Sequence, residues 1–179
     1  MARRSYADVP NRIVRLFLQE AGRQYDTNRG LTPYSSLTDE LKARFHYSCA
    51  YCGSPPPIEL VEEHLVPINR TSAGLHSWGN IVPACKECNR KKRDNPWEQH
   101  PELNAQRREA IKAYIAEYRY SPNVTELSIV LKKLYELADL QTRALVDFAL
   151  VASRPYIAAL HDSGNGNTCS HATIQDITK

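Results

Sequence analysis

The stretch GNIVPACKECNRKKR, residues 79–93, combines three features that together indicate one kind of fold. Its first seven residues are mostly apolar and have the length of an ordinary β-strand. A C-x-x-C pair, Cys85 and Cys88, follows at once, and a run of four basic residues begins two positions after the second cysteine. A short strand that leads into a cysteine pair and then into a basic helix predicts a small unit built around a metal ion.

A second C-x-x-C pair occurs upstream in CAYCG, and 32 residues separate the two pairs. That separation exceeds the ~15–20 residues of simple double-knuckle zinc sites and leaves room for a β-hairpin. Two such turns supply four thiolates, which is the ligand set of a tetrahedral structural zinc. We therefore predict a Zn²⁺ ion bound by Cys49, Cys52, Cys85 and Cys88. A thioredoxin-like redox role is less favoured, because neither pair lies in a βαβ pattern.

The bulk composition is that of a soluble globular protein. The chain has 179 residues, 42% of them hydrophobic and 24% charged, with a formal net charge of +3. No run approaches the ~20 apolar residues that a membrane span needs, and the basic start lacks the apolar segment of a secretory signal. Cysteine pairs suited to metal binding agree with a reducing compartment. We expect a cytoplasmic protein with no membrane partner.

Apolar spacing divides the chain into four predicted segments. Residues 1–46 form an N-terminal helical segment, with a capping pattern from Ser36 to Asp39 before its second helix. Residues 47–98 are turn-rich and poor in large apolar side chains, so a metal would supply part of their stability. Residues 99–160 form a C-terminal helical region, in which Pro101 suits a first helical turn. Residues 161–179 are polar, include the solitary Cys169, and are predicted to be disordered.

One part of the C-terminal helical region is apolar on nearly every side. The segment 144–151 reads ALVDFALV, and a helix of that composition has to be covered by something. Two alternatives stay open for residues 123–160: assembly into a homodimer or with a partner subunit, and packing against the N-terminal helices of the same chain.

The strand IELVEEHLVP, residues 58–67, lies between the cysteine pairs and holds Glu62, Glu63 and His64 side by side. An apolar strand has no packing reason to carry two carboxylates and an imidazole. Taken alone, such a triplet is most often a solvated face. Its position between two metal-binding turns favours chemistry instead.

Residues 45–93 resemble the HNH endonucleases, a family with a ββα-metal fold. The matching features are CAYCG, EEHLVP, GNIVPACKECN and the trailing RKK, and His64, Asn80 and Asn89 occupy the three positions that name the motif. The resemblance implies an α+β protein with a small zinc-stabilised ββα-metal core, flanked by N-terminal helices and a C-terminal helical region. It also implies metal-dependent hydrolysis of phosphodiester bonds in DNA, with RNA left open.

The resemblance assigns a role to each matching residue. His64 is the general base, which suits an imidazole that is largely neutral at cellular pH. Glu63 and Asn89 are the ligands of a catalytic Mg²⁺ or Mn²⁺, an ion that prefers oxygen donors and keeps several waters. Asn80 braces the loop that orients the histidine. Aspartate is common where this chain has Glu63, so Glu62 stays a competitor for the ligand role.

The basic run after Asn89 is the predicted nucleic-acid contact. Arg90, Lys91, Lys92 and Arg93 would bind backbone phosphates, which gives affinity and register rather than sequence choice. A nuclease of this kind suits restriction or another anti-phage defence. The competing hypothesis is a zinc-knuckle module that binds nucleic acid or protein without cutting. For His76, in the loop between the strands, a plain surface position is favoured over a substrate contact.

Overall fold

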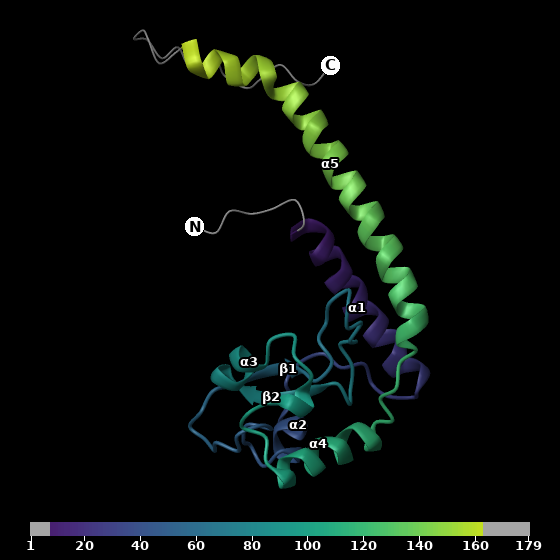
Figure 1. Ribbon diagram of the computed structural model, residues 1–179, viewed down its shortest axis with the longest axis vertical. Coiled ribbons are helices and arrows are strands. Elements are labelled where there is room, and N and C mark those ends of the chain that lie inside the picture. Colours follow the sequence, from purple (N-terminus) through teal and green to yellow (C-terminus); the bar gives the residue numbers. More distant parts are fainter. Residues whose placement is uncertain (1–7, 163–179) are drawn as a thin grey trace. The chain divides into compact units, whose positions relative to one another are not determined.

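The computed structural model describes residues 8–162, and the side chains of residues 8–156 among them. Cys169 and most of the tail that the sequence predicts to be disordered lie outside this range. The described elements, shown in Figure 1, are α1 (Asp8–Asn28), α2 (Asp39–Arg44), β1 (Leu60–His64), β2 (Ile81–Cys85), α3 (Lys86–Lys92), a 3₁₀ turn (Trp97–Gln99), α4 (Ala105–Glu117) and α5 (Val124–Asp162). This mixture of helices with one small sheet confirms the predicted α+β class.

The centre of the fold is an antiparallel hairpin followed directly by a helix. β1 pairs with β2 in a register that places Leu60 opposite Cys85 and His64 opposite Ile81. β2 is buried at every position, and α3 begins at the next residue and contacts both strands. Since neighbouring strand residues point to opposite faces, Glu62 and His64 share one face of β1 and Glu63 lies on the other.

The cysteines are part of the main hydrophobic core. Cys49, Cys85 and Cys88 belong to the same buried cluster as the strand residues Ile81 and Val82. Helices α2 and α4 contribute to this cluster too, through Leu41, Ile111 and Tyr114. The predicted zinc ligands are therefore part of the packed interior, which agrees with the scarcity of large apolar residues in 47–98.

A second buried cluster joins α1, the loop after β1 and the first part of α5. Its members are Val14, Leu18, Ile68, Ala73, Leu75 and Leu131. The first part of α5 thus packs against α1 within one chain. The chain divides by its contacts into two compact units between Asp139 and Leu140, and this packing belongs wholly to the first. None of the helices within residues 8–162 combines the length and apolarity needed to cross a membrane.

The helix starts differ from the predicted ones because other side chains provide the caps. The N-cap of α2 is Thr38, whose hydroxyl accepts a hydrogen bond from the backbone of Leu41 at 3.2 Å, rather than Ser36. α4 begins after Asn104, whose side chain accepts from the Arg107 N–H at 2.9 Å. Pro101 consequently precedes the helix and does not occupy its first turn. In both helices the residue immediately before the first helical residue supplies the cap.

Candidate active site and zinc centre

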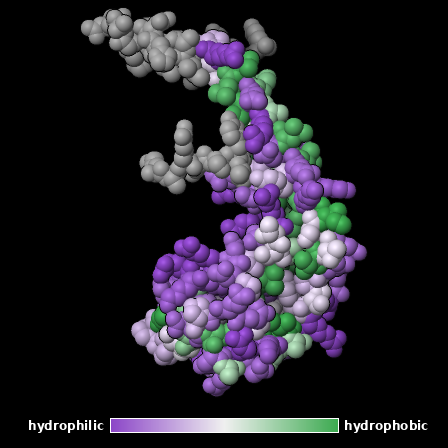
Figure 2. All heavy atoms as spheres, in the orientation of Figure 1, coloured by the Kyte–Doolittle hydropathy of each residue, from purple (hydrophilic) through white to green (hydrophobic). Residues whose placement is uncertain are grey.

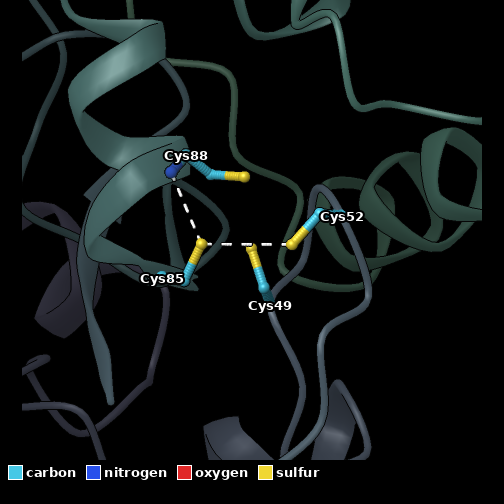
Figure 3. Close-up of side chains that lie close together, drawn as sticks. All are labelled: Cys49, Cys52, Cys85 and Cys88. Atoms are coloured by element: carbon cyan, nitrogen blue, oxygen red, sulfur yellow. Dashed lines mark hydrogen bonds between the residues drawn. The ribbon is translucent and has the colours of Figure 1, made fainter. Parts of the chain in front are cut away.

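The four predicted zinc ligands come together at one point. The Sγ atoms of Cys49, Cys52, Cys85 and Cys88 all lie within 4.8 Å of one another, and Figure 3 shows them directed toward a common centre. The Cys52 and Cys85 sulfurs are 3.9 Å apart. A tetrahedral zinc with ligands at ~2.3 Å would separate its sulfurs by about 3.8 Å, so the donor set fits a zinc ion.

Local structure holds both cysteine pairs in place. The first pair lies in a tight turn in which the Gly53 N–H bonds to the Cys49 carbonyl at 2.9 Å and Gly53 adopts a φ of 75°, a conformation that favours glycine. The second pair spans the start of α3, where the Cys85 sulfur accepts from the Cys88 N–H at 3.4 Å. Burial raises the pKa of the Cys49 and Cys88 thiols, so their thiolates need a cation beside them.

An open cleft of about 610 Å³ lies beside the hairpin. The acidic and imidazole side chains of β1, namely Glu62, Glu63 and His64, line it together with Asn89 from α3. Residues of helix α1 and of the loop after β1 complete its lining. The sequence-predicted base and both predicted metal ligands therefore share one solvent-accessible space.

Glu63 faces α3 and is paired there with a lysine. The Lys92 ammonium lies 2.9 Å from Glu63 Oε1, and the two side chains are only 1% and 7% exposed, respectively. Burial raises the pKa of Glu63, and the ammonium of Lys92 opposes that rise. A buried charge pair of this kind is costly to break from one side, so the two groups hold each other in position.

The other face of β1 makes a different set of contacts. The Tyr34 hydroxyl donates to Glu62 Oε1 at 2.9 Å. His64 Nε2 lies 3.0 Å from Nδ1 of His76, which is half-buried in the loop before β2. His76 is therefore not the plain surface histidine that the sequence favours.

The environment of His64 keeps its imidazole neutral. Burial lowers the pKa of His64 to about 3, and the positive charges of Arg15 and Lys92 and the neighbouring His76 act in the same direction. The neutral form is the one that can accept a proton from water. It is present throughout the range around pH 7, because that range lies far above the lowered pKa.

Asn80 joins the two ends of the loop between the strands. Its Oδ1 accepts from the Val66 N–H at 2.8 Å, and its Nδ2 donates to the carbonyls of Val66 at 3.0 Å and Leu75 at 2.7 Å. The side chain is fully buried, so each of these bonds is costly to lose. This geometry is the one that a loop brace requires.

The four basic residues after Asn89 lie in different environments. The Arg90 guanidinium binds Glu87 through two hydrogen bonds of 2.7 and 3.1 Å, and Lys91 lies 2.9 Å from Glu102. Lys92 is buried against Glu63 and is closed to a surface phosphate. Arg93 is exposed and lines the cleft. The surface over α3 is hydrophilic (Figure 2), but of this run only Arg93 faces the candidate site.

A hairpin followed by a helix, with two cysteines at the strand-helix junction and two more in a turn before β1, is the arrangement of the ββα-metal class with a zinc site. The family model of the HNH endonucleases matches residues 49–95. The chain therefore contains an HNH endonuclease domain, which confirms the resemblance seen in the motifs and implies nucleic-acid binding and a nuclease type of function. A search of curated proteins and a search of solved structures each found no match.

Sequence reasoning missed several residues of the site. Arg15 from α1 and Arg70 from the loop after β1 line the cleft with Arg93. Arg15 is exposed on α1, a helix that the sequence predicted from its apolar residues alone. The pairing of Lys92 with Glu63 was detectable in principle, since Lys92 lies one turn after Asn89 on α3. The contact between His64 and His76 depends on the loop conformation, for which the sequence carries no local signal.

We expect one zinc ion per chain, and its removal should abolish the cooperative fold of the HNH domain. Three of its four ligands belong to the main core, and structural zinc contributes folding free energy directly. Elemental analysis of the purified protein and thermal melting with and without a strong chelator measure both effects. Cys88→Ser should lose the metal and unfold at lower temperature. Cys169→Ser, a cysteine outside the C-x-x-C pairs, is the control and should keep zinc content and melting temperature unchanged.

Proposed function

We propose that the protein is a metal-dependent endonuclease that hydrolyses phosphodiester bonds in DNA. One observation carries the proposal: His64, Glu63 and Asn89 come from two different elements and line the same cleft. The four-cysteine site fixes the hairpin and helix that bear them. A module that only bound a partner would have no need for a neutral imidazole beside a buried carboxylate and an amide.

His64 is the general base of the proposed reaction. It takes a proton from a water whose oxygen attacks phosphorus. As the new P–O bond forms, the bond from phosphorus to the 3′ oxygen breaks, and the leaving 3′ oxygen takes a proton from a solvent water. The products are a 3′-hydroxyl and a 5′-phosphate end. Asn80 supports the loop on which His64 depends, through its bonds to Val66 and Leu75. Positioned proton transfer of this kind contributes about 10²–10⁴-fold to a rate.

Glu63 and Asn89 would hold the catalytic Mg²⁺ or Mn²⁺. Carboxylate and amide oxygens are the donors that such hard ions prefer, and one or two protein oxygens suffice. Lys92 contacts Oε1 of Glu63, and a carboxylate has a second oxygen, so the lysine leaves Glu63 a donor atom that could hold an ion. When bound, the ion stabilises negative charge on the phosphate and on the leaving oxygen.

Arg15, Arg70 and Arg93 are the proposed phosphate contacts. They come from three different segments and all line the cleft. Among the side chains of residues 8–156, none of the three forms an ion pair with a carboxylate. Arg70 also lies over the Tyr135 ring, with 4.2 Å between its guanidinium carbon and the ring centroid, which orients the side chain. Guanidinium groups that no carboxylate neutralises attract a polyanion to a cleft and give salt-dependent binding.

Action in the cytoplasm, in restriction or anti-phage defence, is the physiological setting that we propose. The nuclease type of domain and the cysteines suited to a reducing compartment support this setting. The competing hypothesis remains a zinc-knuckle module that binds nucleic acid or protein without cleavage.

We expect the purified protein to cut plasmid DNA in the presence of Mg²⁺ and His64→Ala to reduce the cleavage rate by at least about 100-fold, because the general base is lost. Gel analysis of supercoiled, nicked and linear plasmid measures the rate. His46→Asn is the matched control, since His46 is exposed, does not line the cleft and has a φ of 54° that asparagine tolerates. Plasmid that stays intact with zinc-loaded, folded protein and either Mg²⁺ or Mn²⁺ would favour the binding module.

The same assay separates the two carboxylates. If Glu63 holds the ion, Glu63→Gln should raise the Mg²⁺ concentration needed for half-maximal cleavage, whereas Glu62→Gln should leave it nearly unchanged. The reverse result would assign the ion to Glu62. Melting temperatures are measured in parallel, because Glu63→Gln also leaves Lys92 without its buried partner.

Arg93→Ala should weaken DNA binding and reduce the slope of log affinity against log salt by about 1, as expected for one lost phosphate contact. Arg90→Ala should change neither, because Arg90 binds Glu87 and lies outside the cleft lining. Fluorescence anisotropy with a labelled duplex at several salt concentrations measures both quantities. Equal losses in the two variants would show that the whole basic run contacts DNA, as its sequence alone indicates.

The part of α5 beyond Asp139 is the proposed surface for self-association or for a partner subunit. Leu140, Phe148 and Val151 are 66%, 72% and 58% exposed and share one face by their spacing, and Figure 2 shows apolar side chains along this part of the helix. Light scattering should give a dimeric mass that Phe148→Gln reduces and Leu16→Gln, at an exposed apolar residue of α1, does not. A monomeric mass for the unaltered chain would exclude self-association and leave a separate partner subunit as the proposed occupant of this surface.

A further inference from the structure

His76 lies against the proposed general base in a way that the HNH motif does not require. Its Nδ1 is 3.0 Å from His64 Nε2, and the ring centroids are 5.2 Å apart. Its ring also packs edge-on against Tyr34 at 5.0 Å, and the Tyr34 hydroxyl donates to Glu62. The contact occupies Nε2 of His64, one of the two ring nitrogens that could accept a proton from water.

The loop that carries His76 is anchored at five consecutive positions. The anchors are Leu75 N–H to the Tyr120 hydroxyl (2.9 Å), His76 N–H to the Leu18 carbonyl (3.4 Å), the Ser77 hydroxyl to Asp26 (2.6 Å), Trp78 Nε1–H to the Thr32 carbonyl (2.8 Å) and Gly79 N–H to the Tyr114 hydroxyl (3.1 Å). These bonds fix the backbone that carries His76, so its side chain has a defined position.

Helix α1 reaches this loop because residue 22 has no side chain. A Cβ atom on Gly22 would lie 2.3 Å from the carbonyl oxygen of His76, which no real contact tolerates. Glycine is ordinarily unfavourable in mid-helix, but a buried glycine stands in α1 at the point where the backbone of His76 passes.

The hydrogen bond has two possible directions, and only one leaves His64 able to act as a base. If His76 Nδ1 carried the proton, His64 would accept at Nε2 and would hold its own proton on Nδ1, with no free lone pair. If His64 Nε2 carries the proton and His76 accepts, Nδ1 of His64 is left unprotonated. We propose that His76 is a positioning residue of the nuclease, which accepts the Nε2–H of His64 and so presents the Nδ1 lone pair to the attacking water.

This role depends on the proposed function, and the surroundings of His76 suit it. An acceptor has to stay neutral, and burial lowers the pKa of His76, with Glu62 and Asp26 opposing and Arg23 reinforcing the shift. When His64 takes the proton from water, both of its nitrogens carry hydrogen, and the bond to His76 then stabilises the imidazolium.

A metal ion shared by the two imidazoles is the rival explanation, since nitrogens 3.0 Å apart can be neighbouring ligands of one ion. Such an ion would need further donors. Among residues 8–156, the four cysteines are the one group of three or more histidine, cysteine or carboxylate side chains arranged for a metal. The hydrogen bond is therefore favoured, and metal content distinguishes the two.

His76→Asn and His76→Leu form the matched pair of variants. The two side chains have nearly the same size, but only asparagine places an acceptor oxygen close to where Nδ1 lies. We expect His76→Leu to lower kcat by about 10–100-fold with KM within about 2-fold, because a wrongly oriented or wrongly protonated base costs mainly the chemical step. His76→Asn should recover most of that loss. Melting temperatures and zinc content of both variants test whether the fold is intact.

Long-range ¹H–¹⁵N spectra of the imidazole nitrogens, recorded without Mg²⁺, give a readout independent of cleavage. His64, assigned by the signal lost in His64→Ala, should carry its proton on Nε2 in the unaltered protein and in His76→Asn, and lose this preference in His76→Leu. A proton on Nδ1 of His64 in the unaltered protein, an unchanged kcat in a folded His76→Leu, or a second metal ion that is lost with His76 would each overturn the inference. Correct tautomers in a protein that cuts no nucleic acid would support the pairing and refute the nuclease proposal instead.

Discussion

Four thiolates that converge on one point are the constraint on which the remainder of this structure depends. The hairpin has only two five-residue strands, and a two-stranded sheet is marginal in water without further support. The cysteines tie a turn before β1 to the junction of β2 and α3. His64 and Asn89 consequently lie on elements that the cysteine site would hold together when it binds zinc, in addition to the buried core that the cysteines share with β2.

α3 joins structural and chemical roles within seven residues. Cys88 belongs to the cysteine site, Asn89 lines the cleft, and Lys92 reaches back to Glu63 on β1. These side chains point in different directions from one short helix, so a change in its placement would disturb the cysteine site and the cleft together. This coupling explains why so small a module can carry a site that needs accurate geometry.

The sequence predicted the local parts of the molecule well and its long-range contacts poorly. Cysteine spacing, the apolar strand and the motif order are all encoded within a few residues, and they led to the α+β core and the zinc ligands. The pairing of His64 with His76 depends instead on a loop fixed by α1, α4 and the segment before α5. The dispersal of Arg90 to Lys92 away from the cleft depends on acidic partners that the charge run does not reveal. The predicted helix starts were wrong because a neighbouring residue supplies the cap: Thr38 caps α2 and Asn104 caps α4.

If Glu63 holds a catalytic ion as proposed, the buried lysine beside it would affect which cations the cleft can retain. Its ammonium already neutralises the carboxylate, so an incoming cation gains little unless it brings more than one positive charge to the same oxygens. Sodium and potassium offer no electrostatic advantage over the lysine already in place. A divalent ion does, and it has to overcome the existing attraction before it can remain. The lysine would thus act as a built-in competitor, which sets a threshold concentration below which the cleft stays without its ion and the protein stays idle.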